Sequence, residues 1–162
     1  ICAPTGSGKS MIAKTLCNTS SYPTKEFQRD CMSGAMYDPN RTSLDTHFQR
    51  SGCAVLTCTK SLQDQYVTEF TDGKALKGMV NYPCGVNEDH TYQDGICKFV
   101  SGQKKVCMKE GQCAYINQRA LTDCNRSQFF NYSVFMQRSP KVKHKDFIVC
   151  DEASELEVIL VG

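Results

Sequence analysis

The sequence predicts an α/β fold, in which a parallel β-sheet carries helices on both faces. Two short apolar runs, residues 53–58 and 147–150, have the length and composition of strands buried on both faces of a parallel sheet. A glycine-rich segment at residues 3–10 separates an apolar start from a helical pattern. This alternation of strands and helices along the chain is typical of a sheet built from parallel strands.

The first strand and helix surround the segment APTGSGKS, which matches the P-loop pattern G-x-x-x-x-G-K-[ST] except that Ala replaces the first Gly. Gly6 and Gly8 let the backbone curl so that its N–H groups point at phosphate oxygens. Lys9, a candidate catalytic residue, can reach the β- and γ-phosphates of ATP, and Ser10 can offer a hydroxyl to Mg²⁺. The N-terminus of the following helix favours an anion. The predicted ATP-binding residues here are Ala3, Pro4, Thr5, Gly6, Ser7, Gly8, Lys9 and Ser10.

The middle of the chain combines an irregular insertion with a second strand and helix. Residues 18–50 are polar and carry several turn signals, so we expect a surface insertion there. The run 53–58 follows as a strand. Apolar residues then recur at helical spacing over residues 59–70, and Thr59 or Ser61 can cap the start of this helix. The apolar stripe consists of Leu62, Tyr66, Val67 and Phe70.

The last part of the chain returns to strands and helices and ends in an acidic pair. We expect a helix over residues 115–121, a strand and the start of a helix over 129–136, and a buried parallel strand over 147–150. Asp151 and Glu152 follow that strand, at the edge where open α/β sheets bind ligands. Asp151 would hold Mg²⁺ through water and contact the bound nucleotide. Glu152 would polarise the attacking water, and is therefore the second candidate catalytic residue.

Residues 78–113 show neither a helical nor a strand period, so this segment needs a source of order other than its own core. It holds four cysteines in the spacing C-x12-C-x9-C-x5-C, namely Cys84, Cys97, Cys107 and Cys113. Four thiolates on one metal centre would supply the missing folding free energy. Structural zinc sites usually show paired C-x2–4-C knuckles, whereas iron–sulfur clusters accept more varied spacing. The spacing favours a cluster over zinc, free or disulfide-bonded thiols remain a third reading, and Cys124 competes for the fourth place.

Composition bounds the class of protein. The chain has 162 residues, enough for one domain, and its formal charge of +2 gives little support to nucleic-acid binding. Any basic track must therefore be local, and the two candidates are Lys104-Lys105 and the run Arg138, Lys141, Lys143, His144 and Lys145. No apolar run is long enough to span a membrane. The eleven cysteines are odd in number and several lie in apolar runs, which favours a reducing, intracellular compartment. The chain opens on the P-loop strand and stops soon after the acidic pair, so we expect a fragment of a longer protein.

Five motifs in this order are similar to those of the XPD/DinG group of superfamily 2 DNA helicases. They are APTGSGKS, VLTCTKSLQDQY, a four-cysteine insertion that ends in CAYINQRAL, FFNYSVFM and FIVCDEAS. The resemblance covers residues 1–17 and roughly 53–155, and residues 18–50 match nothing in the group. Because the motifs are specific in both order and spacing, a chance match is improbable.

The resemblance implies a RecA-like first motor domain interrupted by an iron–sulfur domain. Residues 1–77 and 129–162 would form the ATP-binding part, and residues 78–128 the insertion. It implies a [4Fe–4S] cluster on Cys84, Cys97, Cys107 and Cys113. It also implies ATP-driven 5′→3′ translocation of a monomer along single-stranded DNA, with action at DNA junctions and a role such as DNA repair. Thr57-Cys58-Thr59-Lys60 falls where the group contacts the DNA backbone, and Lys98, Lys104 and Lys105 are further candidate contacts.

Two departures from the group bear on activity. Ser154 stands where the group has the His that helps couple the ATP site to the rest of the motor. The second motor domain is missing, so the isolated fragment should hydrolyse ATP hardly at all. Two other classes of function remain open on the residues alone. One is a non-helicase P-loop ATPase with a zinc-stabilised insertion, and the other is a redox or structural cluster protein with a vestigial P-loop.

Overall fold

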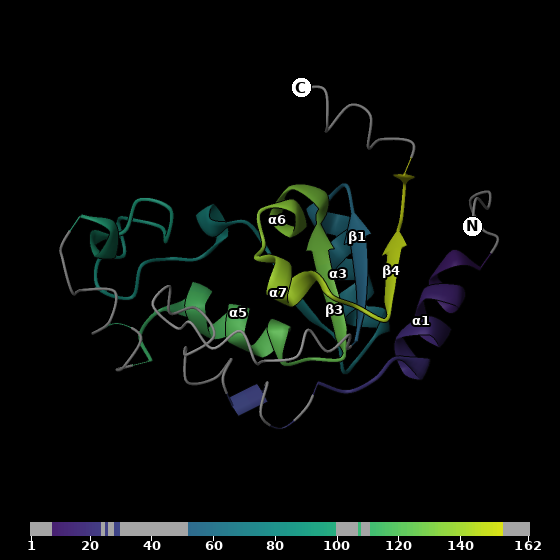
Figure 1. Cartoon of the computed structure of the whole chain (residues 1–162). Helices are drawn as coiled ribbons and strands as arrows, with labels where there is room; N and C mark the ends of the chain where they lie inside the picture. The colour runs from purple at the N-terminus through teal and green to yellow at the C-terminus, as the bar shows by residue number, and fades with distance from the viewer. Residues whose placement is uncertain are drawn as a thin grey trace.

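The computed structural model describes residues 8–23, 25, 28, 29, 52–99, 107 and 111–153. Its centre is a four-stranded, all-parallel sheet in the order β2-β3-β1-β4 (Figure 1). The strands are β1 (Cys53–Thr57), β2 (Lys74–Leu76), β3 (Ser127–Asn131) and β4 (Phe147–Cys150). In the register of the sheet, Val55 lies opposite Phe129 on one side and Val149 on the other. The predicted α/β class with a parallel sheet is therefore confirmed.

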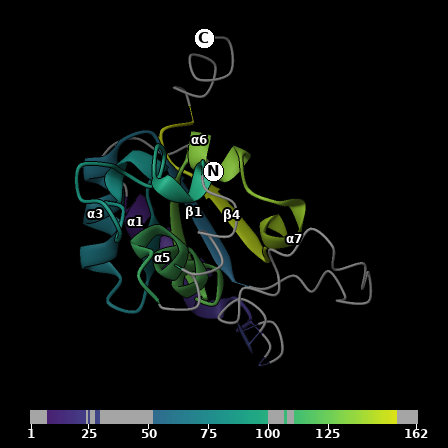
Figure 2. The same cartoon turned by 90° about the vertical axis from the view of Figure 1, so that its left-hand side faces the viewer.

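Helices cover both faces of this sheet. They are α1 (Lys9–Thr19), α3 (Lys60–Glu69), α5 (Ala114–Asp123), α6 (Tyr132–Met136) and α7 (Pro140–Lys143). Figure 2 shows α1 and α3 on one side of the sheet and α7 on the other. Successive side chains of β1 point to opposite faces of the sheet: Cys53 and Val55 pack with α1 and α3, whereas Ala54 and Leu56 pack with α5 and α6. All five residues of β1 are buried, which explains the unbroken apolar run in the sequence.

The strands lead into helices at one edge of the sheet, which we call the carboxyl edge. Thr59 caps α3 there, because its hydroxyl accepts a hydrogen bond from the Leu62 N–H at 3.3 Å. Asn131 caps α6 in the same way, accepting from the Val134 N–H at 2.8 Å. Gly8, with a left-handed φ of 79°, directly precedes α1. These caps fix where each helix starts and so place its first turn beside the strand ends.

The cysteine-rich excursion, residues 78–113, leaves the sheet after β2 and returns through α5. Its described part contains two short 3₁₀ turns, η2 (Met79–Asn81) and η3 (Ile96–Lys98), and one antiparallel bridge between Pro83 and Thr91. Figure 1 shows it at the end of the molecule away from α1. It nevertheless shares one apolar cluster with the sheet. That cluster contains Ala54, Leu56, Leu76, Tyr92, Cys107, Cys113, Tyr115, Ile116, Phe130, Tyr132 and Phe135.

Three elements differ from the sequence-based expectation. Residues 147–150 form the predicted parallel strand, but the prediction that it is buried is wrong: Phe147 is 36% exposed and Ile148 48%. The reason is that β4 pairs with β1 on one side only, within the part of the chain that the structure describes. The short elements β2 and α7 were not predicted, since three or four residues carry no readable period. Among the described residues, no helix has both the length and the apolar character to cross a membrane.

Candidate functional site

The carboxyl edge of the sheet brings the described part of the P-loop segment to the acidic pair. Lys9 and Ser10 begin α1, and Asp151 directly follows β4. The Lys9 ammonium lies 3.8 Å from Asp151 Oδ1, with the lysine side chain 37% exposed and the aspartate 11%. These residues are far apart in the sequence and meet because α1 packs against both β1 and β4. Ala3, Pro4, Thr5, Gly6 and Ser7, which were also predicted to bind ATP, lie outside the described residues.

Asp151 is held by hydrogen bonds from several elements. The Tyr66 hydroxyl, on α3, donates to Oδ2 at 2.9 Å, and the Glu152 N–H donates to Oδ1 at 3.0 Å. The Tyr132 hydroxyl, on α6, donates to the backbone carbonyl at 2.7 Å. The Asp151 N–H in turn continues the sheet by donating to the Leu56 carbonyl at 2.9 Å. The carboxylate therefore has one defined position at the strand end.

Glu152 differs from its neighbour in being exposed to solvent. It has a left-handed φ of 54°, which is uncommon for a residue with a side chain and marks the sharp turn after β4. Its carbonyl accepts a hydrogen bond from the Cys58 thiol at 3.6 Å, so the turn is also tied to the end of β1. The two carboxylates therefore differ: hydrogen bonds fix the position of Asp151, whereas Glu152 is exposed to solvent. Ser154 lies beyond the described residues.

The donor chemistry of this edge fits Mg²⁺ with a phosphate ligand. The Ser10 hydroxyl and the Asp151 carboxylate are oxygen ligands of the kind that Mg²⁺ prefers, and Lys9 supplies a cation for a phosphate oxygen. The first backbone N–H groups of α1, an eleven-residue helix, add a partial positive charge at the same place. The arrangement can bind an anionic phosphate together with its metal ion.

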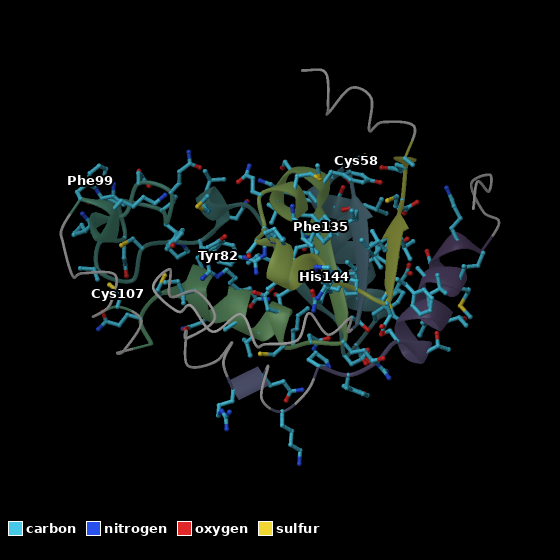
Figure 3. The ribbon with its side chains drawn as sticks, in the orientation of Figure 1. Cys58, Tyr82, Phe99, Cys107, Phe135 and His144 are labelled. Atoms are coloured by element: carbon cyan, nitrogen blue, oxygen red, sulfur yellow. The ribbon has the colours of Figure 1, made fainter. Side chains whose placement is uncertain are left out.

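A second candidate site is a small apolar hollow in the cysteine-rich excursion, which we call the thiol hollow. It is lined by Cys84, Gly85, Tyr92, Gly95, Cys107, Gln112, Cys113 and Ile116. Three of the four predicted cluster ligands therefore converge, and Cys107 and Cys113 are buried. Figure 3 places Cys107 at the far end of the molecule from α1. Cys97, the fourth predicted ligand, belongs to η3, where only its backbone is described.

The local backbone favours the thiolate form of Cys84. Hydrogen bonds from the backbone N–H groups of Val86, Asn87 and Ile96 lower the pKa of the Cys84 thiol. Gly85 permits the approach of the two ends of the excursion, since a Cβ there would lie 2.1 Å from the Gln112 carbonyl oxygen. Thiol donors with N–H groups pointed at sulfur suit an iron–sulfur cluster or zinc. As they stand, no three Cys, His, Asp or Glu side chains within the described ranges are grouped to hold a metal ion.

Cys124, the competing fourth ligand, lies elsewhere. It follows the last residue of α5, whereas Cys113 directly precedes the first, so the ten-residue helix separates the two. Its thiol donates to the Gln28 carbonyl at 3.4 Å. Cys113, and not Cys124, therefore lines the thiol hollow together with Cys84 and Cys107.

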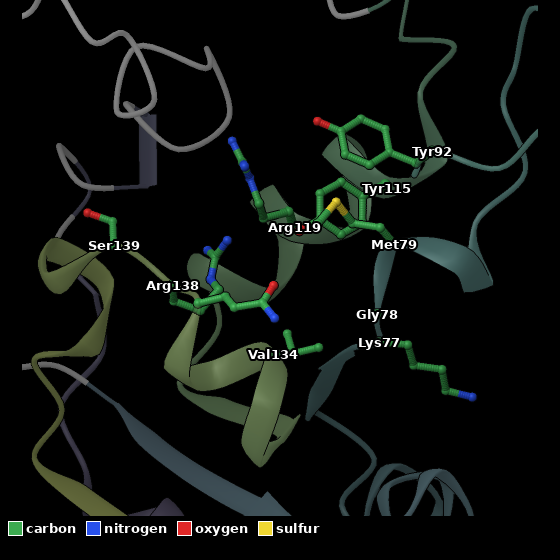
Figure 4. Close-up of a pocket in the computed structure, with 10 residues that line it drawn as sticks. Lys77, Gly78, Met79, Tyr92, Tyr115, Arg119, Val134, Arg138 and Ser139 are labelled. Carbon is green, nitrogen blue, oxygen red and sulfur yellow. The ribbon is translucent and has the colours of Figure 1, made fainter. Parts of the chain in front are cut away.

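A third feature is a cavity of about 250 Å³ between the excursion and the α6–α7 connection, which we call the Tyr–Arg pocket (Figure 4). Tyr92 and Tyr115 stack in its wall with ring centroids 4.2 Å apart. The Arg119 guanidinium lies 6.0 Å from the Tyr115 ring, and Lys77 and Arg138 also line the cavity. Lys98 lies over the Tyr92 ring at 5.4 Å, whereas Lys104 and Lys105 lie outside the described residues. Stacked rings beside cations are suited to an aromatic, anionic ligand.

Reasoning from sequence missed several of these residues. Tyr66 was read only as part of an apolar helical stripe, and its hydroxyl contact to Asp151 spans 85 positions of the sequence. Tyr132 lies in the motif FFNYSVFM and Arg138 opens a candidate basic track, but neither was assigned to a site. The one available signal concerned Tyr132, which directly follows the end of β3 and so lies near the carboxyl edge, whereas Tyr66 lies in the second half of α3 and carried none.

Comparison with known proteins adds nothing to this picture, because no protein family, no curated protein and no solved structure matches the chain.

Proposed function

We propose that this chain is the ATP-binding motor part of a DNA helicase, in which ATP hydrolysis drives 5′→3′ movement along single-stranded DNA. The observation that carries the ATPase half is the meeting of Lys9, Ser10 and Asp151 at the carboxyl edge of an all-parallel sheet. This is the arrangement expected of a RecA-like P-loop domain. The helicase half is supported by the order of the five motifs and by the Tyr–Arg pocket.

Each residue of the carboxyl edge has a role in this reaction. Lys9 exchanges its contact with Asp151 for the β- and γ-phosphates when ATP binds, because a triphosphate carries more charge than one carboxylate. Ser10 and Asp151 hold Mg²⁺, which when bound neutralises charge on the phosphates. Glu152, which is exposed, orients the attacking water on the solvent side of the site. Tyr132 keeps the strand end in place through the Asp151 carbonyl.

The second part of the proposal concerns the cysteine-rich excursion. Cys84, Cys97, Cys107 and Cys113 would hold a [4Fe–4S] cluster, which when bound cross-links the excursion; zinc on the same residues is the alternative. The convergence of three of these thiols in one hollow supports a shared centre. Optical absorption together with iron and zinc analysis of anaerobically purified protein separates the two metals.

The Tyr–Arg pocket gives the DNA strand a binding place beside the excursion. Arg119, which lines the pocket beside the Tyr115 ring, can contact a phosphate or a base plane. Replacing Arg119 with Ala should weaken single-stranded DNA binding at equal salt concentration. Arg126→Ala is the matched control, because Arg126 lies at the start of β3, where it pairs with Asp72 at 3.6 Å.

The test of the whole proposal uses the full-length protein. ATP hydrolysis is measured with and without single-stranded DNA, and strand separation is measured on a duplex with a 5′ tail. Lys9→Ala should abolish hydrolysis, and Glu152→Gln should retain ATP binding while stopping turnover. Hydrolysis that DNA does not stimulate would point instead to a non-helicase ATPase. Wild-type turnover in Glu152→Gln would show that another residue positions the water.

A further inference from the structure

One buried hydroxyl holds the aspartate assigned to the metal. The Tyr66 hydroxyl donates to Asp151 Oδ2 at 2.9 Å. Tyr66 belongs to α3, Asp151 follows β4, and Ser10 lies in the first turn of α1. Tyr66 therefore holds the carboxylate that, together with the Ser10 hydroxyl, would bind one Mg²⁺ ion.

The aromatic core fixes the position of this hydroxyl. Tyr66 is only 2% exposed, and its ring stacks against Phe129 of β3 with centroids 5.8 Å apart. The ring also lies 5.6 Å from that of Phe70, which itself meets Phe129 edge-on at 5.3 Å. A ring held on two sides by a packed core cannot swing away when the site changes its occupant. The Tyr66 hydroxyl therefore keeps its position beside Asp151, although the Lys9 side chain on the other side of that carboxylate is exposed.

The other contacts of Asp151 show why a fixed point is needed. Lys9 and the Glu152 N–H approach Oδ1, whereas the Tyr66 hydroxyl approaches Oδ2. When Lys9 turns to the phosphates of ATP, the carboxylate loses a charged partner. The Tyr66 contact does not depend on the nucleotide, so it can hold the carboxylate while Oδ1 faces a water bound to the metal.

We propose that Tyr66 is a positioning residue for the magnesium site, and that its hydroxyl sets the orientation of the Asp151 carboxylate before the metal arrives. The inference rests on the proposed ATPase function and assigns to the α3 helix a part in metal binding that its sequence pattern does not reveal. Hydrogen bonds to metal-ligating carboxylates orient them and raise metal affinity. Removing the hydroxyl should therefore weaken metal binding while leaving the nucleotide contacts in place.

The experiment compares the full-length wild-type protein with Tyr66→Phe, which keeps the ring and its packing. Mn²⁺ serves as the probe, and its binding is followed by electron paramagnetic resonance in the presence of a non-hydrolysable ATP analogue. We expect Mn²⁺ affinity to fall about tenfold in Tyr66→Phe. The affinity for a fluorescent ATP analogue in EDTA should stay the same. The free Mg²⁺ concentration that gives half-maximal hydrolysis should rise in parallel.

Tyr82→Phe is the matched control, because the Tyr82 hydroxyl accepts from the Lys77 N–H at 3.0 Å, in the excursion and not at the carboxyl edge. It should leave Mn²⁺ affinity unchanged. Wild-type Mn²⁺ affinity in Tyr66→Phe would overturn the inference and leave the proposed function standing. An equal loss of nucleotide affinity in EDTA would also overturn it, since the residue would then support the whole site. Absence of ATP binding by the wild-type protein would overturn the proposed function, and this inference with it.

Discussion

Breaking the buried ion pair between Asp123 and Arg138 should cost more stability than breaking any exposed pair that the structure describes in this chain. Asp123 ends α5 and Arg138 follows α6, and their side chains are 0% and 7% exposed. Removing one partner of a buried pair leaves the other charge without its counterpart in a low-dielectric setting, which typically costs about 3–5 kcal/mol. Asp123→Asn should lower the free energy of unfolding by that amount. For a chain of this size the midpoint temperature falls by about 2–4 °C for each kcal/mol lost.

The assay is urea unfolding followed by circular dichroism, with Asp64→Asn as the control. Asp64 pairs with Lys77 at 2.7 Å, but the two side chains are 57% and 30% exposed, so its loss should cost less than about 1 kcal/mol. The double variant Asp123→Leu/Arg138→Met replaces both charges with apolar groups and should cost less than Asp123→Asn alone. Equal effects of Asp123→Asn and Asp64→Asn, or a double variant that costs the sum of its single changes, would refute the reasoning.

Three further predictions follow from the geometry. Cys113→Ser should lose bound iron while Cys124→Ser keeps it, measured by iron analysis; retained iron in the first and loss in the second would reverse the assignment. Hydrogen bonds from the Thr91 hydroxyl and N–H lower the pKa of Asp94 from 3.8 to about 2. The stability that this turn contributes is therefore fully present above pH 4 and is lost as the pH falls toward 2. Titration of Asp94 followed by nuclear magnetic resonance measures this pKa. Gly52→Ala should destabilise β1, since φ is 76° and a Cβ would lie 2.6 Å from a backbone oxygen; thermal unfolding measures the loss, and an unchanged midpoint would contradict it.

The sequence was a good guide to the long or strongly apolar elements. Residues 53–57 of the run at 53–58 form β1, because their side chains are buried between two layers of helices, and strands buried in this way have nearly continuous apolar sequences. The cap at Thr59 was readable because its hydroxyl acts on a residue three positions away. Burial of residues 147–150 was not readable, since it depends on which strand lies beside β4 and not on the residues themselves.

The candidate sites show the same difference between residues that belong to a local motif and residues that long-range packing brings together. The predicted P-loop and acidic residues could be named because their proposed chemistry is carried by a local pattern, although Ala3 to Ser7 and Ser154 lie outside the described residues. Tyr66 could not be named, because its role depends on a contact with Asp151 that forms only when α3 packs on the sheet. Cys84, Cys107 and Cys113 could be grouped by spacing, but their place against the sheet could not be foreseen.

That place has a consequence for how the protein would respond to damage at its thiols. Cys107 and Cys113 pack in the same apolar cluster as Leu56 and Phe130, which are central residues of the sheet. If these thiols hold the proposed cluster, its loss or oxidation would loosen side chains that also cover one face of β1 and β3. The position of the strand ends at the carboxyl edge would then depend on the chemical state of the thiol hollow. Under the proposed function, the supply of metal would therefore affect how much of the protein stays folded.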